Sequence, residues 1–357
     1  MLICSVVTMR NVRVTSKGTK GPVSARLFMV FARKSPTAVI FRRGPSKWVQ
    51  LIKWDTKSDT FEQGQWFNGR IYERRSDLSP DGSMLIYFAQ KISARSIKDQ
   101  EYTYAWTAIS KPPYLTALAL WPKGDCWHGG GSFKNDRVVL LNHKPEVSTP
   151  HKKHKPHRLL LVIPNPQAHG EDDPIFSQRL ERDGWQLREA WQVENRGYPK
   201  LFHTIQPEVR EKTNPNRTHA VRLTRSIECL DYSEDFAIRD VRQFLVANIA
   251  RASWVDWDQQ GRLVFARDGK IFAASIKGDS NLIEELLIDL NPLKPKSIPP
   301  PSGQRNGNAL SLATCKFDSR QLAHRLPTPS ALHFHRFPSL FPRCRQPAPA
   351  RPVPKSS

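Results

Sequence analysis

The chain has 357 residues, of which 39% are hydrophobic and 10% aromatic, so it carries enough apolar surface for a sizeable core. Its formal net charge of +22 would by itself indicate a nucleic-acid or anionic-membrane partner. Most of the excess lies in the flanks, however, because residues 27–291 hold 39 basic and 32 acidic side chains, a net charge of +7. The central part of the chain is therefore only mildly basic.

Cysteine spacing and hydropathy exclude further classes. The five cysteines lie far apart and form no Cys-x-x-Cys pair, which argues against a disulfide framework and a structural zinc site. No segment approaches the roughly 18–20 consecutive apolar residues that cross a bilayer. The N-terminal sequence MLICSVVTMR lacks the basic region of a signal peptide. We therefore expect a cytoplasmic protein with no membrane partner.

In chain order, residues 1–26 are polar and basic and are interpreted as a lead-in arm. The apolar runs Leu27–Ala32, Thr37–Phe41 and Trp48–Trp54 follow, separated by turn residues. They are too short for ordinary helices and are rich in Val, Ile, Phe and Trp, which favours strands.

The strongest local signal is the turn Ser79–Gly82 (SPDG), which leads directly into the apolar run Met84–Phe88. Proline presets φ at the second turn position, and Asp-Gly supplies residues that tolerate the left-handed region, so a strand is expected next. A related pattern starts at Asp256, 179 residues after Asp77, and is followed by the run Leu263–Ala266. This separation equals about four repeats of the ~40–45 residues typical of a propeller blade.

The SPDG turn before an apolar strand resembles the blade signature of WD40-like and TolB-like β-propellers. The wider stretch Trp48–Phe88 also resembles a group of uncharacterised bacterial proteins, a likeness that brings no activity with it. The resemblance implies an all-β, mostly antiparallel fold, an irregular β-propeller over residues 27–291. At about 45 residues a blade this gives roughly six blades.

One or two short helices interrupt the predicted strands. The segment Arg239–Ala250 places apolar residues on one helical face, and Leu282–Leu287 is the second candidate. From Pro292 the composition changes, because thirteen of the 29 prolines fall in residues 292–357 and the apolar period disappears. We expect a disordered, Pro-rich basic tail there.

A His-Gly-Gly-Gly run begins at His128 and is typical of the oxyanion-hole loop of esterases. The chain has no Gly-x-Ser-x-Gly nucleophile, so a flexible glycine turn is the favoured interpretation. An acidic turn at residues 171–173 offers hard oxygens for Ca²⁺, but its spacing favours an exposed turn.

The loop 144–158 contains three histidines at spacings of three, and imidazole is a common ligand of zinc and nickel. Interleaved lysines oppose a cation, so a solvated basic loop is favoured. Three arginines before the SPDG turn form the most concentrated charge in the central region. The candidate binding residues are Arg70, Arg74, Arg75, His128, His151, His154 and His157.

These features favour a non-catalytic binding or scaffolding protein with a protein partner. The tryptophans are expected to pack between blades rather than to stack nucleic-acid bases. No phosphate loop, HExxH motif or dinucleotide fingerprint is present, so no catalytic residue, cofactor or metal is expected. The alternatives are nucleic-acid binding through the basic flanks and the 144–158 loop, or a propeller-type hydrolase that uses His128 or His169. Oligomeric state stays open.

Overall fold

The computed structural model describes residues 23–44, 46–168, 170, 172–197, 202–229, 231–277 and 281–301. Over this part of the chain the structure is mostly antiparallel β-sheet with two short α-helices, which confirms the expected all-β class. Nearly all of the lead-in arm and of the C-terminal tail lies outside the described residues. No helix among the described residues is long and apolar enough to cross a membrane.

Three sheets share one plan, in which four consecutive strands pair antiparallel with their neighbours in the chain. Up-and-down sheets of this kind are the usual build of a propeller blade. The strands are β1 (Arg26–Phe31), β2 (Thr37–Arg43), β3 (Trp48–Asp55) and β4 (Thr60–Asn68); β5 (Arg70–Leu78), β6 (Leu85–Gln90), β7 (Ala105–Ser110) and β8 (Ala119–Pro122); and β19 (Ala252–Trp257), β20 (Leu263–Arg267), β21 (Lys270–Lys277) and β22 (Asn281–Asp289).

The other two sheets depart from this plan. One has three strands, of which the last pairs in parallel, and the other has seven. Their strands are β9 (Gly131–Asn135), β10 (Val138–Leu141) and β11 (Leu161–Pro164), and then β12 (Gln186–Glu189), β13 (Gln192–Asn195), β14 (Phe202–Gln206), β15 (Glu208–Thr213), β16 (His219–Cys229), β17 (Asp231–Asp240) and β18 (Leu245–Asn248). The helices are α1 (Ala94–Lys98) and α2 (Ile175–Arg182), with a 3-10 turn at Pro145–Val147.

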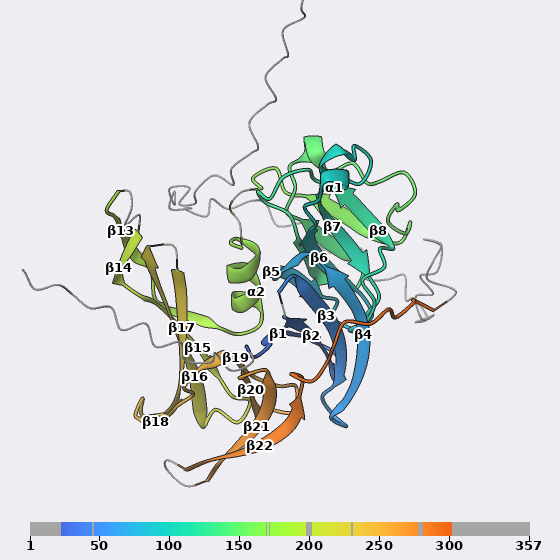
Figure 1. The fold of residues 1–357 in the computed structure, drawn as a ribbon. Coiled ribbons are helices and arrows are strands. Elements are labelled where there is room, and N and C mark those ends of the chain that lie inside the picture. The colour runs from blue at the N-terminus through green and yellow to red at the C-terminus, as the bar shows by residue number, and fades with distance from the viewer. Residues whose placement is uncertain are drawn as a thin grey trace, which may run out of the picture.

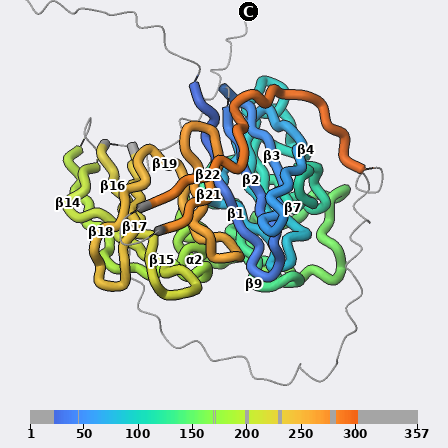
Figure 2. Tube along the Cα trace, turned by 90° about the horizontal axis from the view of Figure 1, so that it is seen from below, coloured from blue at the N-terminus to red at the C-terminus, as the bar shows by residue number. Residues whose placement is uncertain are grey.

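The five sheets of the described chain follow one another around a common centre (Figures 1 and 2). Edge strand β1 contacts β5 on one side and β19 on the other, β5 contacts β9, and β17 contacts β19. Helix α2 lies in the middle and contacts β5, β9 and β12, so it bridges the three-stranded and seven-stranded sheets. The arrangement is propeller-like. It has five sheets where the spacing indicated roughly six blades, because residues 186–248 form a single sheet.

Both turns that the sequence singled out form as expected. The turn at Ser79–Gly82 joins β5 to β6, and the N–H of Gly82 donates to the carbonyl of Ser79 at 2.8 Å. The second joins β19 to β20, and the N–H of Gly261 donates to the carbonyl of Asp258 at 2.9 Å. Both glycines have positive φ, +76° and +77°, which explains why glycine stands there.

The structure has two short helices, but neither lies in a segment that the sequence predicted to be helical. Segment Arg239–Ala250 is a hairpin between β17 and β18, because the Asp240 carboxylate accepts the N–H groups of Arg242 and Phe244 and closes a turn. The apolar Phe244 is consequently 66% exposed instead of buried. Segment Leu282–Leu287 belongs to β22, whose backbone pairs with β21 along its length.

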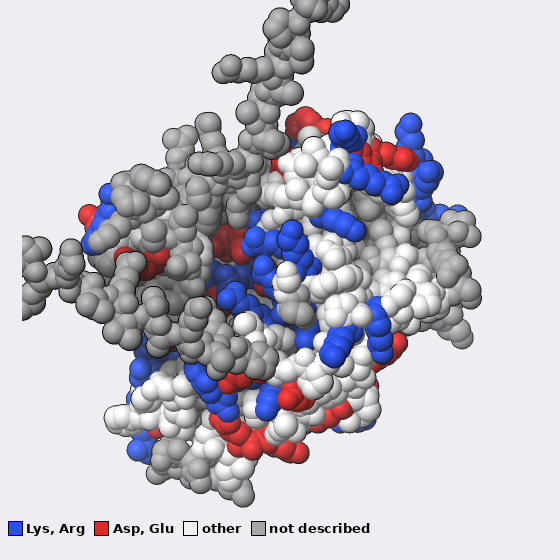
Figure 3. Space-filling view, in the orientation of Figure 1, with Lys and Arg blue, Asp and Glu red and all other residues white. Residues whose placement is uncertain are grey.

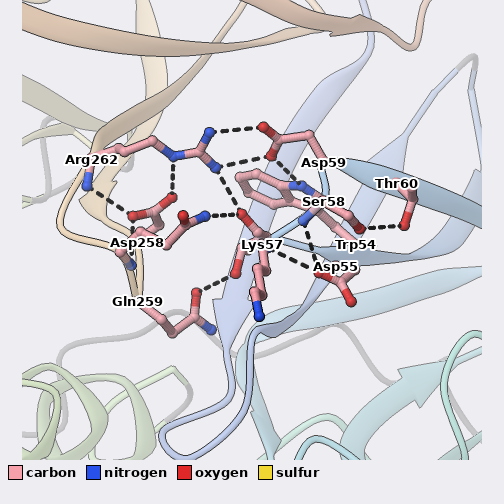
Figure 4. Close-up of polar contacts among 11 residues, drawn as sticks. Trp54, Asp55, Lys57, Ser58, Asp59, Thr60, Asp258, Gln259 and Arg262 are labelled. Carbon is pink, nitrogen blue, oxygen red and sulfur yellow. Dashed lines mark hydrogen bonds and ion pairs between the residues drawn. The ribbon is translucent and has the colours of Figure 1, made fainter.

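A polar clasp joins the first sheet to the last one (Figure 4). The Arg262 guanidinium donates to both carboxylate oxygens of Asp59 at 2.7 and 2.9 Å, and to Asp258 at 2.8 Å. The amide of Gln259 accepts from the Thr56 hydroxyl at 2.9 Å. These contacts hold the β19–β20 turn against the β3–β4 turn, so segments about 200 residues apart in the chain close the arrangement.

Apolar packing accompanies the clasp. Phe31 of β1 lies 6.0 Å from Trp54 and 5.4 Å from Trp254, measured between ring centroids. Both tryptophans are buried, as the sequence predicted. This cluster fixes β1 and β19 beside each other.

Candidate functional site

A cavity of about 510 Å³ lies at the centre, between β1, helix α2, the seven-stranded sheet and β19. Ligand pockets of small molecules commonly have volumes of roughly 300–1,000 Å³ and mostly apolar or aromatic walls. Seven aromatic side chains from β1, from α2 and the residues after it, from β17 and from β19 line this cavity: Phe28, Phe31, Phe176, Trp185, Phe236, Trp254 and Trp257. The cavity therefore has the size and the walls of a small-molecule site.

The charged residues of the cavity balance one another. Four are basic and four acidic, so their formal sum is zero: Arg33, Arg179, Arg182, Lys212, Asp183, Glu234, Asp256 and Asp258. In Figure 3 basic side chains gather on the surface between the seven-stranded sheet and its neighbours, with a smaller acidic patch beside them.

One ion pair joins two walls of the cavity. The Lys212 ammonium of β15 lies 2.7 Å from the carboxylate of Asp256 on β19. Burial raises the pKa of Asp256, although the neighbouring Lys212 favours its charged form. The backbone carbonyl of Lys212 accepts from the Trp257 indole at 2.9 Å, which fixes both residues. The pair has no net charge and offers an occupant of the cavity one donor group and one acceptor group.

A second ion-pair system lies at the end of α2. The Arg182 guanidinium binds the fully buried Asp77 at 2.6 Å and Asp183 at 2.8 Å. Asp183 directly follows α2, and Asp256 opens the second copy of the SPDG-like pattern. Both residues line the same cavity, which the sequence pattern at Asp256 did not indicate.

The three candidate arginines of β5 point to different places. A bulge between Tyr72 and Asp77 interrupts the pairing of β5 with β6, and bulges redirect side chains. Arg74 pairs at 2.8 Å with Glu234 on β17, a residue that lines the cavity. Arg75 is fully buried and donates to two backbone carbonyls, whereas Arg70 lies over the ring of Tyr72.

Arg74 also belongs to a cluster around Phe176 of α2. The guanidinium carbons of Arg74, Arg179 and Arg225 lie 5.1, 5.6 and 5.0 Å from the centroid of this ring. Arg225 pairs in turn with Glu208 at 3.0 Å and with Glu234 at 3.4 Å. The cluster attaches α2 to the seven-stranded sheet, so it supports the cavity wall.

The glycine loop after His128 has a packing role. The N–H of Gly129 donates to the carbonyl of Asn142 at 2.9 Å, and that of Gly130 donates to the Thr107 hydroxyl at 2.8 Å. These groups are therefore engaged and do not form an oxyanion hole. A Cβ on Gly130 would lie 2.1 Å from the backbone oxygen of Arg75, which explains the glycine. His169 lies outside the described residues.

The three histidines of the 144–158 loop have different surroundings. His151 is only 4% exposed, stacks on Tyr102 at 4.1 Å between ring centroids, and lies 3.1 Å from Glu101. His154 contacts the Tyr102 hydroxyl at 3.3 Å, and His157 lies apart from both and accepts a local backbone N–H. The lysines of the loop are exposed, so the solvated-loop interpretation describes them and not His151.

The acidic turn and the histidines form no metal centre in the described chain. The carboxylate of Asp172 pairs with Arg75 at 3.2 Å, and that of Asp173 accepts from Ser177. Residue 171 is outside the described ranges. Across the residues that the structure describes, no group of three or more His, Cys, Asp or Glu side chains is placed to hold a metal ion.

Comparison with known proteins adds little. No family model matches the sequence, and no curated protein matches it. Among solved structures, the periplasmic gluconolactonase PpgL of Pseudomonas aeruginosa is 10% identical, with a TM-score of 0.26 over 74% of this chain and 85% of that chain. The hydrazine synthase of Kuenenia stuttgartiensis is 12% identical, with a TM-score of 0.17 over 78% and 70%. Scores this low carry no argument about fold or activity.

Proposed function

We propose that the protein is a non-catalytic binding protein of the β-propeller class, and that its ligand is a small uncharged or zwitterionic molecule in the central cavity. The observation that carries this proposal is the cavity of about 510 Å³, with aromatic walls and charges that sum to zero. Paired charges that are already satisfied favour a ligand that brings both a donor and an acceptor but no net charge. The expected kinship with WD40-like and TolB-like repeats is part of the same proposal.

A hydrolase function is not proposed. The N–H groups of Gly129 and Gly130 already bind Asn142 and Thr107, so these two donors are not free for a developing oxyanion. Nucleic-acid binding stays a prediction that rests mainly on the flanks, since the cavity has no net positive charge. A protein partner on the outer loops and a cytoplasmic location also stay predictions.

The test is a ligand screen of the full chain by ligand-observed NMR, with probes sorted by charge. Neutral sugars and zwitterionic amino acids form the expected group, while dicarboxylates and diamines are the charged controls. We expect saturable binding only in the first group. A screen in which only the charged controls bind would contradict the proposal, and so would one without saturable binding.

A matched pair of variants locates the site. Lys212→Met removes the ammonium of the cavity pair. Lys270→Met removes an ammonium that lies 3.7 Å from the Asp289 carboxylate, in a pair that does not line the cavity. We expect at least a tenfold loss of affinity for the best zwitterionic ligand in the first variant and no change in the second. Equal affinities in both variants would place the ligand elsewhere.

A further inference from the structure

A second and separate pocket of about 250 Å³ lies between strands of the first two sheets and the 144–158 loop. It shares no lining residue with the central cavity. Its walls contain four aromatic rings, three aliphatic side chains and one histidine, and no Lys, Arg, Asp or Glu: Phe67, Tyr87, Tyr102, Trp106, Leu115, Ala117, Leu120 and His154.

A strap formed by residues 151–154 closes one side of this pocket. The N–H of His151 donates to the carbonyl of Leu120 at 2.8 Å, and the N–H of Leu120 donates to the carbonyl of His154 at 3.0 Å. These two bonds fasten the strap along the free edge of β8. The stack of His151 on Tyr102 holds it from the other side, so His154 is fixed as a wall of the pocket.

The strap also sets the charge of the site. Burial lowers the pKa of His154 below its ordinary value, and the neighbouring His151 and Lys153 lower it further. The wall is thus neutral at pH 7. Exposed lysines at positions 152 and 153 lie in the same strap and would repel a cationic ligand.

Size and wall chemistry specify the occupant. An apolar cavity of about 150 Å³ is large enough for benzene in other proteins, so about 250 Å³ leaves room for two fused rings. The rings of Phe67 and Trp106 meet edge to face, with centroids 5.8 Å apart, an arrangement in which aromatic groups attract one another. The hydroxyl of Tyr102 contacts the ring of His154 at 3.3 Å, and both residues line the pocket, so they form a polar pair in its wall.

We propose that this pocket binds a small, flat, uncharged bicyclic aromatic molecule, with Tyr102 and His154 as its polar contact. The site is independent of the ligand proposed for the central cavity. It gives a role to the histidine loop that the sequence pattern had associated with metal ions or with solvent.

The experiment uses indole as the probe and the full chain, with binding followed by ligand-observed NMR. Tryptamine, which adds an ammonium to the same rings, is the charge control. We expect saturable binding of indole and at least tenfold weaker binding of tryptamine. Absence of saturable indole binding up to its solubility limit would overturn the proposal, and tighter binding of tryptamine would overturn the assigned ligand class.

Two variants confirm the place of binding. Ala117→Phe fills the pocket, and Ala94→Phe adds the same ring at an exposed position of α1 as the matched control. We expect at least a tenfold loss of indole affinity in the first variant and no loss in the second. If Ala117→Phe does not fold, Leu115→Trp fills the same space from the β7–β8 connection. Undiminished indole binding in a folded filled variant would refute the site.

Discussion

Replacement of Arg262 by alanine should open the clasp between the first and last sheets. Arg262 makes two bonds to Asp59 and one to Asp258, and its side chain is 32% exposed. The side chains of Asp59 and Asp258 are 29% and 0% exposed. Hydrogen bonds to charged groups contribute about 1.5–3 kcal/mol when buried, and exposed ion pairs roughly 0–1 kcal/mol.

The buried Asp258 contact therefore dominates, because the variant leaves this carboxylate without its ion-pair partner. We expect Arg262→Ala to lower the free energy of unfolding by about 3 kcal/mol. This corresponds to a decrease in Tm of roughly 6–12 °C for a domain of this size. Urea unfolding followed by tryptophan fluorescence measures the free energy, and calorimetry measures Tm.

The matched control is Arg251→Ala, because Arg251, just before β19, pairs at 2.9 Å with Asp268 in the β20–β21 turn but is 74% exposed. Its loss should cost less than about 0.5 kcal/mol. The bond from Arg262 also holds the pKa of Asp59 below its ordinary value. That part of the stability is present above pH ~4 and is lost as the pH falls through the lowered pKa. Equal effects of the two substitutions would refute the role of the clasp.

Two further predictions concern buried groups. Burial lowers the pKa of His143 to about 4, so the unfolded chain takes up a proton first and stability falls as the pH decreases from about 6.5. Between pH 6.5 and 5 the free energy of unfolding of the wild type should fall by about 1.6 kcal/mol more than that of His143→Gln. Urea unfolding at several pH values measures both, and the same pH dependence in the two proteins would contradict this. Gly130→Ala should cost about 3 kcal/mol, because its Cβ meets the Arg75 oxygen at 2.1 Å and φ is +75°. Gly197→Ala, with φ +69° and no atom within 4 Å, should cost only about 1 kcal/mol, and similar losses in both would disprove the close approach as the cause.

Local patterns predicted the strands and turns well, because alternation and turn chemistry act within a few residues. Trp48–Trp54 lies within a strand, and the turns at Ser79–Gly82 and Asp256–Gly261 form as expected. The segment Arg239–Ala250 has a helical apolar period, but the side chain of Asp240 competes for the backbone and produces a hairpin. Local competition of this kind is invisible to a periodicity argument.

The candidate site was harder to predict, since it depends on residues that are distant in the chain. Arg74 was selected as charged, but only the bulge in β5 brings it to Glu234, whereas Arg75 beside it is buried. Lys212 and Asp256 meet because two sheets face the same centre. The sequence contains both residues and no sign of their pairing.

A crystal structure of the full chain with the best uncharged or zwitterionic ligand from the screen would test the central claim most directly. We expect density for the ligand between β1, α2 and β19, against Trp257 and within hydrogen-bond distance of the Lys212–Asp256 pair. An empty cavity, with the ligand bound on the outer loops, would contradict the account and would favour the prediction that those loops bind a partner.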